Sequence, residues 1–205
     1  MKKSIKLSNC TLVSLVSFGN NKLPKSTIIF NMGPAKTCAS DALGLCKVSN
    51  KCYAKKAERL YPQVLPYRMR QAAYWLTSDI ETIKVDFKAL LSCKREKPTK
   101  LRLNESGDFY NQECITKAEK LAMFLKKEYN IITYTYSARS DLDFSGCKAL
   151  LVKGSGHNQG NNGQTLVVPK NTLQAPKGSI FCPGSCKVCS ACSSDRKINI
   201  AFKMH

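Results

Sequence analysis

The stretch Leu101-Arg-Leu-Asn-Glu105-Ser-Gly-Asp-Phe109 is followed by an amphipathic segment over residues 113–129 and then by Ile131-Ile-Thr-Tyr-Thr-Tyr136. Short apolar or β-branched runs on either side of a segment with a 3.6-residue apolar repeat predict a strand, a helix and a second strand. Turns rich in polar residues follow both strands, at 106–109 and at 137–141. Strands that alternate with helices are typical of a parallel sheet whose polar loops gather at the carboxyl ends of its strands.

On the N-terminal side, two apolar runs at residues 10–18 and 26–32 flank Gly19-Asn20-Asn21, which predicts a β-hairpin. Helices are predicted next over residues 53–60, 66–76 and 80–91. Good helix formers fill the second of these helices, with Met69, Ala72, Ala73 and Leu76 as its apolar face. Ser78-Asp79 is the expected cap of the third helix.

On the C-terminal side, further short strands are predicted at residues 149–153, 165–168, 179–181 and 198–202. The units are too few for an eight-stranded barrel, so we expect a partial α/β barrel or an open, mostly parallel sheet. A chain of 205 residues fits one domain. Its expected parts are an N-terminal hairpin (1–33), an α/β core (34–175) and a C-terminal cysteine-cluster segment (176–205).

Four cysteines lie close together near the C-terminus, in Cys182-Pro-Gly-Ser-Cys186-Lys-Val-Cys189-Ser-Ala-Cys192. Such short gaps keep the sulfurs near one another and resemble, in reverse, the run that ligates a 4Fe–4S cluster in bacterial ferredoxins. Zinc is the alternative metal, because four thiolates also satisfy a tetrahedral site. Zinc sites usually consist of two cysteine pairs separated by a longer segment, so the spacing favours iron–sulfur.

A second group, Cys38, Cys46 and Cys52, lies on the loop before the helix predicted at residues 53–60. Three thiolates leave one iron of a four-iron cluster without a protein ligand, unless a fourth ligand comes from elsewhere. An open iron is what a cluster needs to bind a small cosubstrate. A single cluster that uses members of both cysteine groups is a further alternative.

Several of these motifs together resemble the phage and prophage gene product 88 family. They are the first cysteine group with Tyr53-Ala54, Ser106-Gly107-Asp108-Phe109 after a strand, the strand end at 134–137, and the closing cysteine run, so the resemblance spans about residues 28–203. It implies an iron–sulfur protein of phage type with no settled activity, in the cytoplasm of an infected or lysogenic host cell.

The same layout resembles a shortened radical S-adenosylmethionine (SAM) barrel. By that likeness, Cys38, Cys46 and Cys52 would hold a cluster with an open iron, and Ser106, Gly107 and Asp108 would line the neighbouring cosubstrate site. The early spacing is longer than in the radical enzymes, whose C-x3-C-x2-C pattern occurs here only near the C-terminus. No catalytic residue is identified.

The net charge of +19 is concentrated in residues 1–100 and favours a polyanionic partner, either nucleic acid or an acidic protein. No apolar run approaches the ~20 residues that span a bilayer. No signal peptide is recognisable at the start of the sequence, so a cytoplasmic protein without membrane contact is expected. The alternative function is a non-catalytic nucleic-acid-binding protein with structural zinc.

Arg139, His157 and the cysteines outside the two groups can be explained by ordinary structural roles. Arg139 follows a strand and is a candidate anion ligand or a solvated turn residue, and His157 lies in a Gly/Asn-rich loop. The separate cysteines are expected to pack in the core or to be partly exposed; they are Cys10, Cys93, Cys114 and Cys147.

Overall fold

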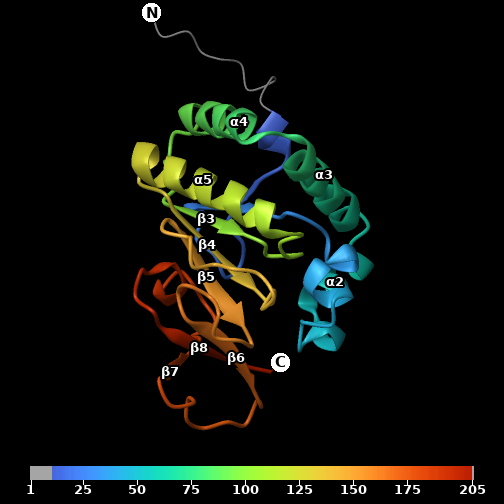
Figure 1. Ribbon diagram of the computed structural model, residues 1–205, viewed down its shortest axis with the longest axis vertical. Helices are drawn as coiled ribbons and strands as arrows, with labels where there is room; N and C mark the ends of the chain where they lie inside the picture. Colours follow the sequence, from blue (N-terminus) through green and yellow to red (C-terminus); the bar gives the residue numbers. More distant parts are fainter. Residues whose placement is uncertain (1–10, 205) are drawn as a thin grey trace, which may run out of the picture.

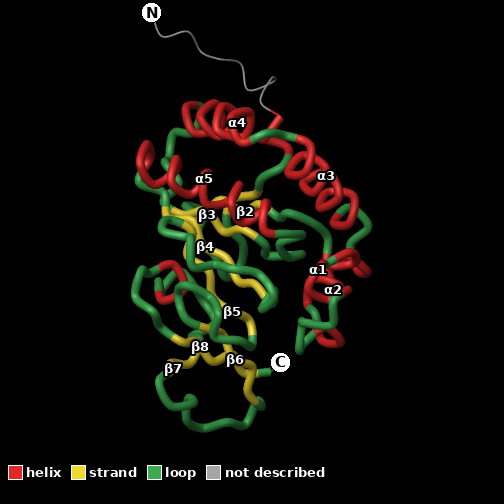
Figure 2. The backbone as a smooth tube through the Cα atoms, in the orientation of Figure 1, coloured by secondary structure: helices red, strands yellow, loops and turns green. Residues whose placement is uncertain are grey.

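Figures 1 and 2 show a computed structural model of the chain, in which residues 11–204 are described. The α-helices are α1 (Ala39–Ala42), α2 (Tyr53–Leu60), α3 (Val64–Thr77), α4 (Ile80–Ser92) and α5 (Gln112–Tyr129). Short 3₁₀ helices are η2 (Thr11–Ser14), η3 (Ala35–Thr37), η4 (Ser49–Lys51) and η5 (Ala191–Ser193). The strands are β1 (Ser17–Phe18), β2 (Thr27–Phe30), β3 (Lys100–Leu103), β4 (Ile132–Ser137), β5 (Leu150–Ser155), β6 (Gln164–Val168), β7 (Ser179–Phe181) and β8 (Asn199–Lys203).

The strands form one open sheet in the order β1-β2-β3-β4-β5-β6-β8-β7. Among the described residues, the β1–β2 pair is antiparallel and every other pair of neighbours is parallel. The sheet does not close on itself, which confirms the predicted open, mostly parallel α/β architecture.

The N-terminal hairpin is confirmed, but its strands are shorter than predicted. Residues 11–14 form a 3₁₀ turn instead of a strand, and two residues of β1 pair with β2. Gly19 turns the chain in the left-handed region at φ 60°, where an added Cβ would lie 2.7 Å from the carbonyl oxygen of Pro24. Cys10 lies outside the described residues.

Helices cover one face of the sheet, over β2 to β5 (Figure 1). Ile28, Leu101, Leu103 and Leu150 point to this face and are fully buried. They pack with apolar side chains of the helices, including Trp75, Ile83, Phe87, Leu121 and Leu125. The alternating pattern of β3 is therefore the reason why it buries leucines on the helix side and presents Arg102 to the other side.

Helices α4 and α5 begin where polar side chains cap them. Asp79 accepts a hydrogen bond from the Thr82 backbone N–H at 2.7 Å, as predicted. Asn111 caps α5 by accepting from the Cys114 N–H at 3.0 Å. Each cap satisfies an N–H that the first helical turn leaves without a partner.

The predicted apolar face of α3 is wrong except at Ala72. Met69 and Leu76 are more than half exposed, whereas the buried side chains are Arg68, Gln71, Ala72 and Trp75. The helix is rotated because the two polar residues have specific buried partners. Gln71 donates to the carbonyl oxygen of Leu15 at 2.6 Å and accepts from the Asn31 amide at 3.1 Å.

The C-terminal cysteine segment lies on the face opposite the helices. Its η5 turn contacts β4, and the Cys186 N–H donates to the carbonyl oxygen of Lys22 in the hairpin turn at 2.9 Å. Figure 2 shows that loops join β6, β7 and β8, with the short turn η5 between β7 and β8. Of the helices in the described residues, none is both long and apolar enough to cross a membrane.

Candidate functional site

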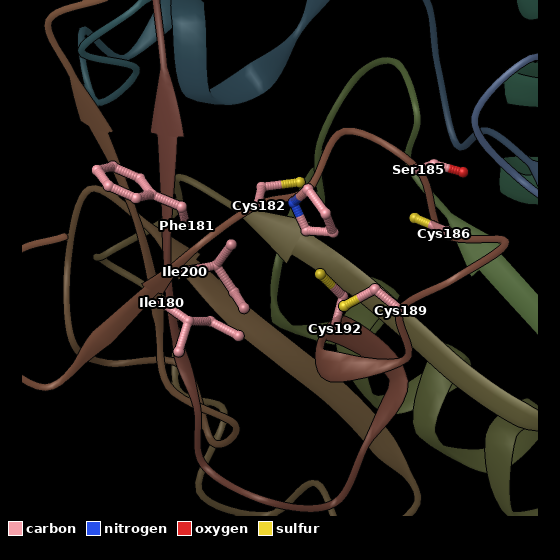
Figure 3. Close-up of a pocket in the computed structure, with 9 residues that line it drawn as sticks. Ile180, Phe181, Cys182, Ser185, Cys186, Cys189, Cys192 and Ile200 are labelled. Atoms are coloured by element: carbon pink, nitrogen blue, oxygen red, sulfur yellow. The ribbon is translucent and has the colours of Figure 1, made fainter. Parts of the chain in front are cut away.

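The four C-terminal cysteines line one pocket beside β7 and β8 (Figure 3). The side chains of Cys182, Cys186, Cys189 and Cys192 surround a common space, and each is partly exposed. Ile180, Phe181 and Ile200 form the apolar wall. The pocket therefore combines four thiols, side chains of the type that soft metals prefer, with an apolar wall.

Hydrogen bonds hold both ends of this loop. The Cys182 N–H donates to the carbonyl oxygen of Ala201 on β8 at 2.9 Å, and the Gly184 N–H donates to the Cys182 sulfur at 3.4 Å. Asn162 donates to the carbonyl oxygen of Ser194 at 2.8 Å and fixes the far end of the segment. An N–H directed at a sulfur is the kind of contact that stabilises a thiolate ligand.

Two buried cations and two tyrosines lie beneath the cysteine segment. Arg102 on β3 pairs in register with Tyr134, and Tyr136 pairs with Lys153 on β5, so all four share the face opposite the helices. The Arg102 guanidinium carbon lies 3.8 Å from the ring centroid of Tyr136 and 5.3 Å from that of Tyr134. Lys153 is fully buried, and its Nζ donates to the carbonyl oxygens of Asn162 and Ile198 at 2.6 and 2.8 Å.

Cys192 is the thiol most closely coupled to this layer. Burial raises its pKa, while a hydrogen bond with the Tyr136 hydroxyl and the charges of Arg102 and Lys153 act to lower it. Burial also raises the pKa of Cys186, and Arg102 again acts in the opposite direction. Burial in the pocket thus favours the protonated form of Cys186 and Cys192, and a bound cation would favour their deprotonation.

The other cysteine group lies on the loop that leaves the carboxyl end of β2. Cys38 precedes α1, Cys46 lies beyond it, and Cys52 immediately precedes α2. Asp41 ties the loop together by pairing with Lys55 at 2.6 Å and by accepting a hydrogen bond from Ser49.

The three thiols of this loop lie within electrostatic reach of one another. Burial raises the pKa of Cys46, and negative charge on Cys38 or Cys52 would raise it further. Burial also raises the pKa of Cys38, a hydrogen bond with the Ser40 hydroxyl (3.2 Å) acts to lower it, and Asp108 acts to raise it. A bound cation would favour the deprotonation of Cys38 and Cys46.

Glu58 on α2 links this loop to the body of the protein. It forms an ion pair with Arg68 at 2.8 Å, and both side chains are less than 10% exposed. Its carboxylate also accepts from the N–H groups of Ala35 and Lys36, at 2.6 and 3.0 Å, and from the Ser106 hydroxyl at 3.3 Å. One carboxylate therefore fixes the start of the cysteine loop against the turn after β3.

The turn Ser106-Gly107-Asp108 adjoins the three-cysteine loop but uses most of its polar groups internally. The Ser106 N–H donates to Asn31 Oδ1 at 2.8 Å. Asp108 accepts from the Ser137 hydroxyl and the Ala138 N–H, at 2.7 and 2.8 Å, and burial raises its pKa. Ser106 and Asp108 are both almost fully buried.

Only glycine fits at position 107, because the backbone there is left-handed and closely packed. Its φ is +72°, and a Cβ added there would lie 2.5 Å from the carbonyl oxygen of Gly33. Glycine therefore lets the turn after β3 approach the chain that leaves β2.

No three Cys, His, Asp or Glu side chains within residues 11–204 are gathered closely enough to hold a single metal ion. The seven predicted ligands lie in two groups, one on the β2 loop and one on the β7–β8 connection. The four-cysteine group shares a pocket, and the three-cysteine group shares a loop.

Arg139 and His157 have structural partners. The Arg139 guanidinium pairs with Asp141 at 2.7 Å and donates to the carbonyl oxygens of Phe109 and Tyr110. The His157 ring contacts the carbonyl oxygen of Ser137 at 2.9 Å through Nε2, and Nδ1 accepts from the Gln159 N–H.

The separate cysteines agree with the predicted packing role in the described residues. Cys114 and Cys147 are buried and Cys93 is partly exposed. Burial raises the pKa of Cys147 to about 12, so it is an inert thiol under ordinary conditions.

Sequence reasoning missed Arg102, Lys153 and Glu58. A charged residue inside an apolar strand was the available signal for the first two, in Leu101-Arg-Leu103 and Leu150-Leu-Val-Lys153. Both faces of a parallel strand are normally covered, so a cation there needs a specific environment. Glu58 gave no such signal, because an acidic residue in a helix rich in lysines suggests a solvated surface.

The comparisons with known proteins identify the family of this chain but not its activity or ligands. No curated protein and no solved structure matches the chain significantly. The sequence profile described as "Gene product 88" matches residues 6–150. The match begins earlier than the expected resemblance and ends before the closing cysteine run, so it includes Cys38, Cys46, Cys52 and the turn at 106–108 but not residues 182–192. Because it covers well over half of the sequence, the chain belongs to the gene product 88 family of phage proteins.

Proposed function

We propose that this protein binds iron–sulfur clusters and that Cys182, Cys186, Cys189 and Cys192 hold one four-iron cluster. The observation that carries the proposal is the single pocket that these four thiols line, on a sheet face with buried cations beneath it. A polynuclear cluster needs one thiolate at each corner iron, and thiolate–metal clusters carry negative charge. Structural zinc is the competing occupant, since it accepts the same four ligands.

Cys38, Cys46 and Cys52 are the proposed ligands of a second, site-differentiated cluster. Their mutual electrostatic coupling and their position at the carboxyl end of a parallel strand support this assignment. When bound, a four-iron cluster supplies one-electron transfer, and an iron without a protein thiolate supplies a Lewis-acid position. The three thiolates hold the cluster, Glu58 fixes the loop, and the partly buried setting limits water.

A SAM-type cosubstrate is the ligand class that this second site favours. The turn at Ser106, Gly107 and Asp108 adjoins Cys38, and its side chains are shielded from solvent. This turn would position the ligand through its backbone groups, because Ser106 and Asp108 already form hydrogen bonds with other residues of the protein.

Protein purified without oxygen is expected to be brown and to contain about eight irons and about eight sulfides per chain. Cys186→Ser and Cys46→Ser should each lose about half of the iron, because each removes one ligand from a different group. Adding SAM should change the visible spectrum of the wild type and of Cys186→Ser, but not that of Cys46→Ser. Iron, sulfide and zinc analysis together with absorption spectra measures all of this.

Cys93→Ser is the matched control, since that residue terminates α4 outside both groups and should keep the full iron content. Zinc without sulfide in the wild type would overturn the iron–sulfur proposal. Equal loss of all iron from both variants would instead indicate one shared cluster.

Nucleic acid is the partner that the charge of the loaded protein favours. The three-cysteine loop and α2 carry exposed basic side chains, including Lys36, Lys56 and Arg59. Affinity for a short oligonucleotide should fall steeply between about 50 and 200 mM salt, as expected when phosphate contacts release counterions. A triple Lys36→Gln, Lys56→Gln, Arg59→Gln variant should bind more weakly and with a smaller salt slope, whereas unchanged binding would exclude this surface.

A further inference from the structure

Arg102 and Lys153 are buried cations without a carboxylate partner in residues 11–204. Arg102 is 8% exposed and Lys153 is fully buried. The four ion pairs of the described residues involve Lys55, Arg68, Lys84 and Arg139 instead. A buried charge is costly unless it is paired, so two such cations on one sheet face indicate an anion near them.

The contacts that these cations do make leave their charge uncompensated. Arg102 lies against the ring faces of Tyr134 and Tyr136. Lys153 uses two of its three donors on the carbonyl oxygens of Asn162 and Ile198. Burial raises the pKa of Tyr134 to about 12 and also raises that of Tyr136 well above its ordinary value, so neither tyrosine supplies negative charge near neutral pH.

The cysteine segment is the source of negative charge that faces them. Cys192 lies in the η5 turn, which contacts β4, the strand between those that carry Arg102 and Lys153. Lys153 Nζ also donates to the carbonyl oxygen of Ile198, at the end of the same β7–β8 connection. Glu105 is the carboxylate whose charge also acts on Tyr134, but it accepts a hydrogen bond from Asn20 at 2.7 Å and forms no ion pair with Arg102 or Lys153. Thiolates of the cysteine segment, Cys192 first among them, are therefore the candidates to balance both cations.

We propose that Arg102 and Lys153 are the built-in counter-charges of the cluster on Cys182, Cys186, Cys189 and Cys192, and that they set its reduction potential. This inference rests on the proposed function. Reduction adds one electron to a cluster that is already negative, and a fixed positive charge in a poorly solvated place stabilises the reduced form more than the oxidised form. Both residues are positioning groups that act through the field at the cluster, since neither is a ligand.

The test is a redox titration of the full-length protein, with the C-terminal cluster identified by the signal that Cys186→Ser lacks. Arg102→Gln should make one-electron reduction at least about tenfold less favourable, a shift of ~59 mV to more negative potential. Arg102→Lys keeps the charge and should retain most of the wild-type potential. Lys153→Met should shift the potential in the same direction as Arg102→Gln, and it keeps the inference testable if one substitution prevents folding.

Lys187→Gln is the matched control. It removes the same charge from the residue that follows Cys186, but Lys187 is exposed, so water screens it and the potential should stay unchanged. A cluster whose potential is the same in the wild type, Arg102→Gln and Lys153→Met would overturn this inference and leave the proposed function intact. A wild-type protein without iron and sulfide would overturn the proposed function itself, and the inference with it.

Discussion

Replacing Glu58 by glutamine is expected to lower the free energy of unfolding by about 3–5 kcal/mol, the cost of breaking a buried ion pair from one side. The substitution leaves the Arg68 guanidinium buried without its counter-charge. It also weakens the acceptor of the Ala35 and Lys36 N–H groups, which a charged oxygen binds more strongly than a neutral amide does. Chemical denaturation monitored by far-UV circular dichroism measures the loss.

Glu81→Gln is the control for this experiment. Glu81 pairs with Lys84 at 2.7 Å, but its side chain is 74% exposed, so its loss should change stability by less than about 1 kcal/mol. Adding Arg68→Met to Glu58→Gln should recover part of the loss, because it removes the stranded charge. If Glu58→Gln costs no more than Glu81→Gln, the buried pair does not stabilise this loop.

The same substitution has a local consequence. Ala35 and Lys36 lie three and two residues before Cys38, so a loosened carboxylate contact frees the start of the three-cysteine loop. Iron attributable to Cys38, Cys46 and Cys52 should fall in Glu58→Gln, while iron on the C-terminal group stays.

Gly107→Ala is expected to cost about 2–5 kcal/mol of stability. A left-handed backbone costs a non-glycine residue about 1–2 kcal/mol, and forcing atoms into a packed site adds about 1–3 kcal/mol. Both terms apply, since φ is +72° and the new Cβ would lie 2.5 Å from the Gly33 carbonyl oxygen. Backbone atoms cannot move aside as a flexible side chain can, so the β2 and β3 loops would have to separate.

Gly44→Ala separates the two contributions. Gly44 has nearly the same φ, +69°, but no atom lies within 4 Å of an added Cβ. Its substitution should therefore cost only the backbone term of about 1–2 kcal/mol. Thermal unfolding of both variants gives the comparison, and equal losses would mean that the close approach of Gly33 and Gly107 contributes nothing.

Much of the fold follows from the sequence because its elements are local. The apolar repeats of residues 80–92 and 112–129 and the Asp79 cap specify helices through near neighbours. The parallel order follows from strands that alternate with helices. Residues 11–14 were misassigned because a short apolar run satisfies a 3₁₀ turn as well as a strand.

The orientation of α3 depends on contacts that local patterns do not contain. Arg68 and Gln71 turn inward because Glu58 and the carbonyl oxygen of Leu15 lie there, 10 and 56 residues away. Such partners override the apolar periodicity of Met69 and Leu76.

The candidate site also has one part that the local sequence predicts and one part that depends on tertiary contacts. The cysteine spacings are local, so both thiol groups could be identified from the sequence. The layer of Arg102 and Lys153 beneath Cys192 could not, because it depends on which face of β3 and β5 the C-terminal segment covers.

The parallel pairing of β7 with β8 bears on how the protein matures. Parallel neighbours need a crossover, usually a helix that has its own hydrogen bonds and apolar face. Here the crossover is residues 182–198, whose regular structure is the three-residue turn η5 and whose length contains all four C-terminal thiols. With metal bound to those thiols, ligand bonds would take the place of the missing helix and cut the entropy of the open loop. The last edge of the sheet would then assemble together with the cofactor, so that cluster insertion and the final folding step would be one event.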